Sequence, residues 1–204
     1  MSTGRRLVVL RHGETEFNAA GRWQGQFDAP LSERGHVQAA EAARMLASYS
    51  PKCVVASDLS RAADTGRAVA EAAGIPITYD ARLREVNVGD WAGLTNAQIR
   101  EQSGDLLERI DAGEDLRRGG TGETLDEVAR RVHAAALEVA ERMAPDTTTV
   151  IATHGVAGRA LVAALTGIAQ HTAWLGVGNL GNCHWAVVED GSRGWRMTGW
   201  NLPV

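Results

Sequence analysis

The sequence LVVLRHGET at residues 7–15 decides the fold. Four consecutive apolar residues are followed at once by Arg11, His12 and Gly13, a pattern that predicts a buried strand with polar groups at its carboxyl end. In an open α/β sheet, ligands bind at that end of the strands. An arginine beside a histidine combines an anion clamp with a nucleophile or base, which is the chemistry of phosphate handling, although the pair alone is equally compatible with a surface dipeptide.

Composition limits the class of protein. The chain has 204 residues, enough for a core of its own, and we expect a single domain over residues 1–204. The net charge of -4, without blocks of like charge or apolar stretches of membrane-spanning length, argues against nucleic acid or a membrane as partner. Cys53 and Cys183 lack a CxxC partner, so neither a zinc site nor a disulfide framework is indicated. The short segment before residue 7 leaves no room for a signal peptide, and we expect a cytoplasmic protein.

Strand and helix patterns alternate beyond the first strand. Short apolar runs predict strands, and longer segments with apolar residues at helical spacing predict helices. These elements are a helix over 33–49, a strand over 53–56, a helix over 61–73, a strand over 77–79, a strand over 148–152, a helix over 156–166 and an antiparallel hairpin of 183–189 with 195–200. Residues 14–30 lack periodicity, and we expect a long loop over the first strand end, where such loops are usually functional.

Three polar residues predict helix starts. Ser32 is an N-cap for the first helix, whose expected inward residues are Val37, Ala40, Ala43 and Leu46. Thr95 with Gln98 forms a capping box for a helix that we expect to be short. Thr124 with Glu127 forms a second capping box, which opens a clearly amphipathic helix.

Five motifs occur in one order along nearly the whole chain. They are Arg11-His12-Gly13-Glu14-Thr15, Ser57-Asp58-Leu59-Ser60-Arg61-Ala62 with Thr65, Leu83-Arg84-Glu85 with Gly89 and Trp91, Gly122-Glu123-Thr124, and His154-Gly155. In this order they resemble the histidine phosphatase superfamily, also called the phosphoglycerate-mutase-like family. Because Gly155 rather than Asp follows the second histidine, the chain is similar to the branch of mutases and small phosphatases.

The resemblance implies a phosphohistidine mechanism without a metal or another cofactor. His12 matches the nucleophile of the family, since an unprotonated imidazole nitrogen can attack phosphorus. Arg11, Arg61 and His154 match its phosphate pocket, where positive charge and hydrogen-bond donors stabilise the transferring phosphoryl group. Glu85 matches its proton donor, because a neighbouring phosphate disfavours the ionised carboxyl.

Further residues match supporting positions of the family. The expected substrate contacts are Thr15, Asn18, Gln24, Gly25 and Gly155. Gln24 stands where mutases commonly have Thr or Ser, which puts mutase-like contacts in doubt. Glu123 is explained equally well as a pocket residue and as an acidic residue that favours the helix dipole. Trp23 and Trp174 fall in segments expected to overhang the site, where an aromatic wall could accept a sugar.

The fold class that follows is a three-layer α/β/α sandwich. Its sheet is mostly parallel with an antiparallel edge strand, and the site lies at the carboxyl ends of the strands. The exposed edge of the C-terminal hairpin leaves room for a homodimer.

The expected activity is hydrolysis of a small phosphorylated metabolite. The interval between Glu85 and His154 is shorter than in mutases of this branch, which predicts a more open site where water accepts the phosphoryl group. The segment 174–185 is similar to that of actinobacterial glucosyl-3-phosphoglycerate phosphatases, while phosphosugar, alpha-ribazole and broad-specificity phosphatases are alternatives. A phosphoglycerate mutase is the alternative reaction. An inactive phospho-ligand binding module is disfavoured because all five catalytic candidates are present.

Overall fold

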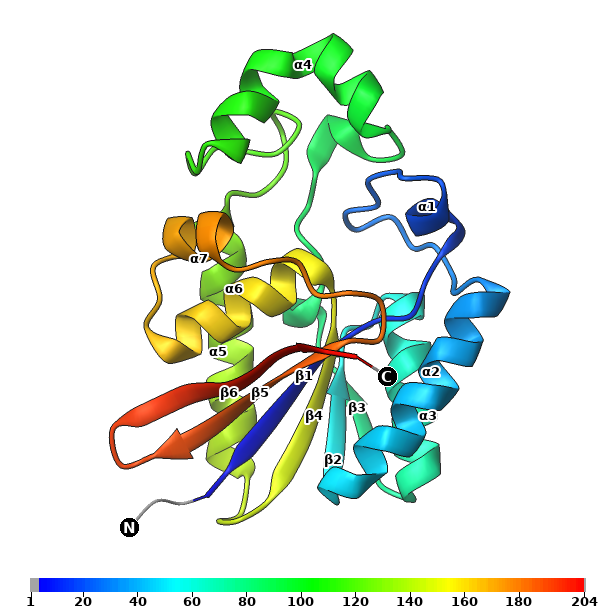
Figure 1. The fold of residues 1–204 in the computed structure, drawn as a ribbon, viewed down its shortest axis with the longest axis vertical. Helices are drawn as coiled ribbons and strands as arrows, with labels where there is room; N and C mark the ends of the chain where they lie inside the picture. The colour runs from blue at the N-terminus through cyan, green and yellow to red at the C-terminus, as the bar shows by residue number, and fades with distance from the viewer. Residues whose placement is uncertain (1–3, 204) are drawn as a thin grey trace.

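Six strands form one mixed sheet in the order β3-β2-β4-β1-β5-β6 in the computed structural model, which describes residues 4–203 (Figure 1). The strands are β1 (Arg6–Arg11), β2 (Cys53–Ala56), β3 (Ile77–Tyr79), β4 (Thr148–Thr153), β5 (Trp185–Gly191) and β6 (Gly194–Leu202). The first four run parallel, whereas β5 pairs antiparallel with both β1 and β6. The predicted mixed α/β fold, with an antiparallel hairpin at the sheet edge, is confirmed.

Helices pack on both faces of this sheet. They are α1 (Glu16–Ala19), α2 (Glu33–Leu46), α3 (Ser60–Ala73), α4 (Asn96–Asp111), α5 (Leu125–Arg142), α6 (Gly155–Thr166) and α7 (Gln170–Gly176), with single 3-10 turns η1 (Ala47–Tyr49), η2 (Ala81–Leu83) and η3 (Gly89–Trp91). Because side chains alternate along a strand, Leu7 and Val9 join the core with α5 and α6. Val8 and Leu10 join the core with α2 and α3. None of the helices in residues 4–203 is both long and apolar enough to cross a membrane.

Helix starts follow the predicted capping residues. Ser32 Oγ accepts the Gly35 N–H at the start of α2. Thr95 and Thr124 head complete capping boxes at the starts of α4 and α5. Gly74 ends α3 in the left-handed conformation, with φ of 64°.

The structure corrects two predictions on loops and helix lengths. The expected loop over 14–30 contains α1, because Thr15 and Asn18 form a capping box that the sequence pattern did not show. The helix after Thr95 is not short: α4 has 16 residues and is interrupted by the non-helical backbone of Ser103. This helix is largely polar, and only Ile99, Leu107 and Ile110 are buried, which explains why periodicity missed it.

Two further differences concern the inward face of α2 and the presence of α7. Val37 and Ala40 are exposed on α2, whose buried residues are Gly35, Ala39, Ala42, Ala43 and Leu46. The inward face is therefore rotated from the predicted one, because small alanines rather than Val37 pack against α3. No apolar pattern or capping residue predicted α7.

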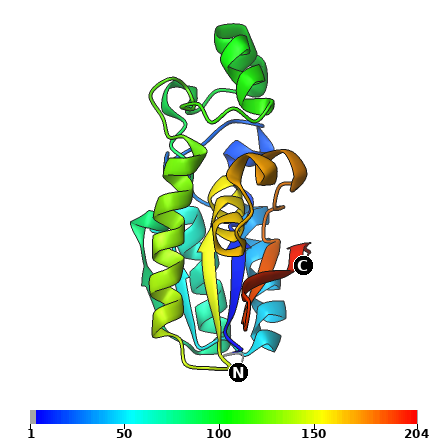
Figure 2. The ribbon, with the colours of Figure 1, turned by 90° about the vertical axis from the view of Figure 1, so that its left-hand side faces the viewer.

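A segment without strands lies beyond the carboxyl ends of the parallel strands. Residues 84–124, called the cap here, carry η3 and α4 and lie at the end of the molecule opposite the N-terminus (Figures 1 and 2). Ile99, Leu107 and Ile110 of α4 are members of the same buried cluster as α5 and α6, so the cap is anchored to the core. The carboxyl ends of β1 and β4 face this segment (Figure 1).

Candidate active site

Two histidines lie together because their strands are neighbours in register. β1 and β4 pair in parallel with Arg11 opposite Thr153, and His12 and His154 each follow directly. The His12 N–H donates to the Thr153 carbonyl at 3.0 Å, which fixes the first residue beyond the strand. The two rings meet edge to face with centroids 5.2 Å apart, and both side chains are buried.

The hydrogen bonds of His12 decide which ring nitrogen can react. Nδ1 lies 2.6 Å from the Gly13 carbonyl oxygen, which can only accept a hydrogen bond. We therefore assign the proton to Nδ1, so Nε2 carries the free lone pair. Burial, followed by the charges of Arg61 and Arg11, holds the pKa of His12 well below its ordinary value, and the ring is neutral at pH 7.

Two arginines supply positive charge beside this ring. Arg11 ends β1 and donates from Nη1 to the Leu180 carbonyl at 2.5 Å. Arg61, in the first turn of α3, donates to the carbonyls of Phe27 and Gly25, at 2.8 Å each. Burial lowers the pKa of Arg61 to about 10, so its guanidinium stays charged at pH 7. These backbone contacts hold both guanidiniums in place without neutralising them.

The start of α6 binds the carboxylate of Glu85. Oε1 accepts the N–H groups of Val86 and Ala157, each at 2.9 Å, and Oε2 accepts the Val156 N–H at 3.2 Å. The first N–H groups of a helix have no partner within the helix, and its dipole favours an anion there. A Cβ at Gly155 would lie 3.6 Å from Nε of Arg11 and 3.7 Å from Oε2 of Glu85, so Gly155 keeps the space between them open.

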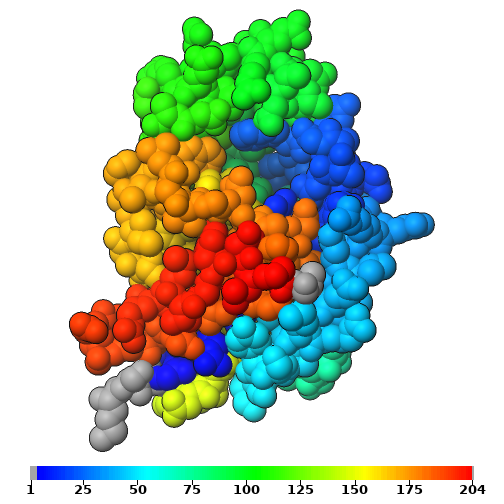
Figure 3. Space-filling model, in the orientation of Figure 1, coloured from blue at the N-terminus to red at the C-terminus, as the bar shows by residue number. Residues whose placement is uncertain are grey.

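These groups line a cavity of about 320 Å³. It is lined by Arg11, His12, Asn18, Arg22, Trp23, Gln24, Gly25, Arg61, Glu85, Val86, Val88, Gly155, Val156, Trp174 and Asn179. Figure 3 shows the surface hollowed where the blue residues around α1, the green cap and the orange segment of α7 meet. The cavity thus lies between the strand ends and the cap.

Buried nitrogen atoms around this cavity indicate what it can bind. Nε of Arg11, Nε of Arg61 and Nδ1 of His154 are buried and have no hydrogen-bond partner among residues 4–203. A buried donor without an acceptor is costly, so such groups mark places where a ligand supplies the acceptor. With two guanidiniums present, the ligand of suitable chemistry is an oxyanion such as a phosphoryl group.

Comparison with known proteins identifies the family. The sequence model of the histidine phosphatase superfamily (branch 1) matches residues 7–203. The chain belongs to this superfamily. The resemblance predicted from the five motifs is therefore confirmed for this histidine phosphatase.

Several relatives of this histidine phosphatase are similar over almost their whole length. Glucosyl-3-phosphoglycerate phosphatase of Mycolicibacterium vanbaalenii is 38% identical over 98% of this chain and 96% of the relative. The solved structure of a mycobacterial glucosyl-3-phosphoglycerate phosphatase with VO3 has a TM-score of 0.88 and 36% identity, covering 97% of this chain and 99% of that chain. A probable phosphoglycerate mutase of Salmonella choleraesuis is 33% identical over 95% of this chain and 89% of the relative.

Most of the predicted site residues of this histidine phosphatase meet at the cavity. Asn18, Gln24, Gly25 and Gly155 line it together with Arg11, His12, Arg61 and Glu85, and Trp23 and Trp174 form part of its wall. His154 lies behind the lining, against the ring of His12. Thr15 does not line the cavity, because it is buried and its hydroxyl caps α1.

Glu123 lies outside the cavity lining and forms an ion pair with Arg131 of α5, with Nε and Oε1 2.8 Å apart. Arg131 was not singled out from the sequence. Its guanidinium also donates to the main-chain carbonyls of Arg82, Arg84 and Glu85 at 2.6 to 2.9 Å, and so fixes the segment that carries the carboxylate. The sequence pattern that could have indicated Arg131 is its position next to Val132, which belongs to the apolar stripe of α5.

Two other contacts near the cavity were also missed. Nδ2 of Asn182 donates to the His12 carbonyl at 3.1 Å and to Oδ1 of Asn18 at 3.2 Å. The guanidinium carbons of Arg159 and Arg118 lie 4.4 and 5.2 Å from the centroid of the Trp174 ring. These cation–π contacts support one wall of the cavity.

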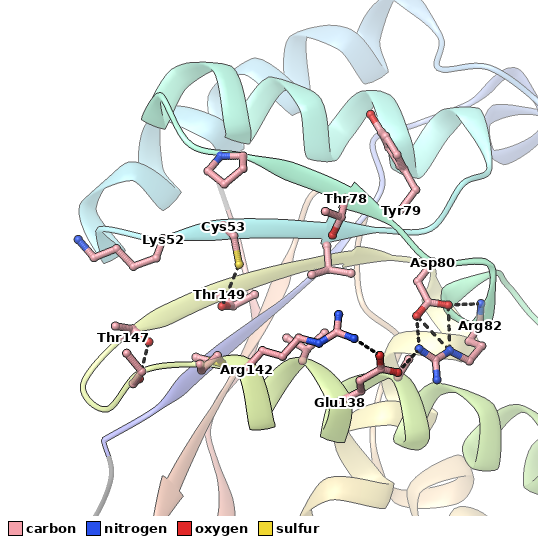
Figure 4. A pocket seen from close by; sticks show the side chains of 16 residues that line it. Lys52, Cys53, Thr78, Tyr79, Asp80, Arg82, Glu138, Arg142, Thr147 and Thr149 are labelled. Atoms are coloured by element: carbon pink, nitrogen blue, oxygen red, sulfur yellow. Dashed lines mark hydrogen bonds and ion pairs between the residues drawn. The ribbon is translucent and has the colours of Figure 1, made fainter.

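A larger groove, of about 810 Å³, lies elsewhere, between α5 and the strands β2, β3 and β4 (Figure 4). None of the residues that line it is a histidine. Apart from Lys52, its charged side chains pair with one another, since Arg82 pairs with Asp80 and Glu138, and Arg142 also pairs with Glu138. Within residues 4–203, no cluster of three or more His, Cys, Asp or Glu side chains is arranged to hold a metal ion. The smaller cavity therefore holds the chemistry of interest.

Proposed function

We propose that this histidine phosphatase hydrolyses glucosyl-3-phosphoglycerate through a phosphohistidine intermediate on His12. The observation that carries the proposal is the neutral ring of His12, whose Nε2 is free beside the unpartnered nitrogen atoms of Arg11, Arg61 and His154. A nucleophile next to an oxyanion pocket is the arrangement that phosphoryl transfer requires.

In the first step, Nε2 of His12 attacks phosphorus, a P–N bond forms and the P–O bond to the leaving group breaks. The guanidiniums of Arg11 and Arg61 and the Nδ1–H of His154 stabilise the charge on the three other phosphoryl oxygens. This step requires Glu85 in its protonated form, which the negative charge of the bound phosphoryl group favours against the N–H groups of α6. The carboxyl gives its proton to the leaving alkoxide, which departs as the free alcohol.

In the second step, the roles of Glu85 are reversed. Its carboxylate takes a proton from a water molecule while the water oxygen attacks phosphorus. The P–N bond breaks, inorganic phosphate forms and the lone pair returns to Nε2 of His12. Each turnover restores both groups to their starting protonation.

The substrate is proposed from the relatives and from the cavity wall. Two similar proteins bear the name glucosyl-3-phosphoglycerate phosphatase, at 36–38% identity over nearly the full chain. Trp23 and Trp174 line the cavity, and aromatic faces of this kind pack well against the apolar side of a sugar ring. These observations support a glycosylated ester over the phosphoglycerate mutase reaction, for which the relative is less similar.

The decisive experiment measures phosphate release from a panel of esters in the presence of a chelator. The panel contains glucosyl-3-phosphoglycerate, 3-phosphoglycerate, phosphosugars and nitrophenyl phosphate. We expect a kcat/KM for glucosyl-3-phosphoglycerate at least about tenfold above the other natural esters, undiminished by chelator. Interconversion of phosphoglycerates without phosphate release would overturn the proposal in favour of a mutase.

The covalent intermediate has its own test. Rapid alkaline quenching of a reaction with labelled substrate preserves a phosphohistidine, and peptide mapping locates it. We expect the label on the peptide that contains His12, and we expect the folded His12→Ala variant to carry none and to turn over no substrate.

A further inference from the structure

Ser57 contacts one of the two ring nitrogens of His154, whose ring lies against that of His12. Its Oγ lies 2.9 Å from Nε2 of His154, and both side chains are completely buried. Ser57 directly follows β2, and its N–H donates to the Ala152 carbonyl of the neighbouring strand β4 at 2.9 Å. The serine and the histidine are therefore fixed to each other by the pairing of two central strands.

The hydrogen-bonding capacity of the serine determines the direction of this contact. A hydroxyl has one proton to donate. Oγ of Ser57 accepts the Leu59 N–H at 3.3 Å, and within residues 4–203 its only other partner is Nε2 of His154. Because a buried hydroxyl proton needs an acceptor, Ser57 donates to Nε2, and Nε2 must then be unprotonated.

A neutral imidazole with an unprotonated Nε2 carries its proton on Nδ1. Nδ1 of His154 is buried and has no partner among residues 4–203, and its ring faces the ring of His12. The opposite tautomer would leave Nδ1 with a lone pair and the Ser57 hydroxyl without an acceptor. The first arrangement is therefore favoured both with and without substrate.

We propose that Ser57 is a positioning residue that sets the tautomer of His154, so that Nδ1–H donates to a phosphoryl oxygen of the substrate. The serine itself does not touch the substrate. The proposal rests on the proposed function only in the identity of the acceptor, because the tautomer is a property of the free protein.

The first test is the ring nitrogen spectrum of His154 in the free protein. The spectrum is recorded on the full-length protein with nitrogen-15-labelled histidine. The signals of His154 are identified as those that are missing from the spectrum of the His154→Asn variant. We expect a protonated Nδ1 and an unprotonated Nε2 in the wild-type protein. A protonated Nε2 in the wild-type protein would overturn the proposal, whether or not any variant folds.

The second test compares Ser57→Ala with Ser57→Thr, which keeps the hydroxyl. We expect Ser57→Ala to populate the other tautomer and to weaken the binding of inorganic phosphate, measured by calorimetry, by about tenfold, the value of one hydrogen bond to a charged group. Ser57→Thr should restore both the tautomer and the affinity. Loss of the tautomer without loss of phosphate affinity would contradict the proposal.

Ser60→Ala is the matched control. It removes a hydroxyl from the same motif, where Oγ of Ser60 donates to the Ala29 carbonyl at 3.3 Å and contacts neither histidine. We expect unchanged tautomer and affinity. Failure of the wild-type protein to bind phosphate would count against the proposed function, while the spectrum would still decide the role of Ser57.

Discussion

His12 and His154 are neutral at pH 7 for the same physical reason. The pKa of each is held well below its ordinary value, first by burial and then by nearby positive charge. Among the charged groups, Arg61 has the largest effect on both histidines. Arg61 itself stays charged, although burial lowers its pKa to about 10. One neighbourhood thus supplies an unprotonated nucleophile and a positive charge for the phosphoryl oxygens.

The proposed proton donor predicts a dependence on the leaving group. We expect Glu85→Gln to lower kcat/KM by about a hundredfold for an alkyl ester such as glucosyl-3-phosphoglycerate, since the alkoxide needs a proton. For nitrophenyl phosphate we expect less than about a tenfold loss, because nitrophenolate is a stable anion. The measurement is steady-state kinetics with both esters.

This comparison uses kcat/KM because it reports only the steps up to transfer of the phosphoryl group to His12. Activation of water by Glu85 in the second step therefore does not enter. Equal losses for the two esters would exclude Glu85 as the proton donor.

The sequence predicted the central residues of the candidate site because each belongs to a motif at the end of a predicted element. His12 and His154 follow apolar runs, and the pairing of those two strands brings them together. Thr15 was predicted at the cavity but caps α1, because a threonine before a short helix has a competing backbone partner. Ser57 lay in a quoted motif, but its contact with His154 depends on the order of strands and could not be derived from spacing.

At the scale of elements, α5 connects the core to Glu85 through Arg131. Removal of this guanidinium takes the side-chain donor from the carbonyls of Arg82 and Arg84 and one of two donors from the Glu85 carbonyl, which keeps Nε2 of Gln26. It also removes the ion-pair partner of Glu123. We expect Arg131→Met to lower the free energy of unfolding by about 2–4 kcal/mol in urea titrations. We also expect kcat to fall by about tenfold, because the proton donor loses its anchoring.

Arg130→Met is the control on the same helix. Arg130 is exposed, and its Nε donates to the Asp126 carbonyl at 3.3 Å. We expect little change in stability or kcat for this variant. If Arg131→Met reduced stability but left kcat unchanged, Arg131 would have no part in positioning Glu85.

The short helix α7 predicts a separable effect on substrate binding. Trp174 lines the cavity and is supported by Arg159 and Arg118. We expect Trp174→Ala to raise KM for glucosyl-3-phosphoglycerate by about tenfold and to leave KM for 3-phosphoglycerate nearly unchanged, since only the first substrate has a sugar ring to stack.

Trp195→Ala is the control for the loss of an aromatic side chain, because Trp195 lies near the start of the outer strand β6 and does not line the cavity. We expect its KM values to match those of the wild-type protein. A parallel rise in KM for both substrates of Trp174→Ala would argue against stacking on this tryptophan.

Elements with strong apolar patterns were predictable, and polar ones were not. The strands and α5 follow from runs and stripes of buried residues. α4 and α7 bury few of their residues, so their sequences carry little periodic signal. The face of α2 was misassigned because several alanines can satisfy more than one inward stripe, and packing against α3 selects among them.

At the scale of the whole molecule, the buried histidines link stability to pH. Because the folded protein holds both pKa values well below 6.5, the unfolded chain binds more protons as the pH falls through that value. Their contribution to stability is therefore complete above pH 6.5 and is lost towards lower pH. We expect the free energy of unfolding to fall by up to about 1.4 kcal/mol per pH unit for each histidine.

Urea titrations between pH 5 and 7.5 in a phosphate-free buffer measure this dependence. The window lies above the ordinary values of carboxyl groups, so histidines dominate it. We expect His12→Asn to reduce the slope of the free energy of unfolding against pH by the contribution of one histidine. An unchanged slope in this variant would show that His12 does not resist protonation in the folded protein.

The distribution of the site over the molecule has a consequence for how such a protein can change. The nucleophile His12 and the phosphate-binding His154 are held by the buried centre of the sheet, whereas Trp23, Trp174 and Asn179 stand on segments outside it. Replacement of these wall residues leaves the strand register intact, provided that Gly25 and Asn182, which hold Arg61 and the His12 carbonyl, are kept. Variation confined to the wall thus offers a route, in natural divergence or in a designed library, to new esters cleaved by an unaltered reaction.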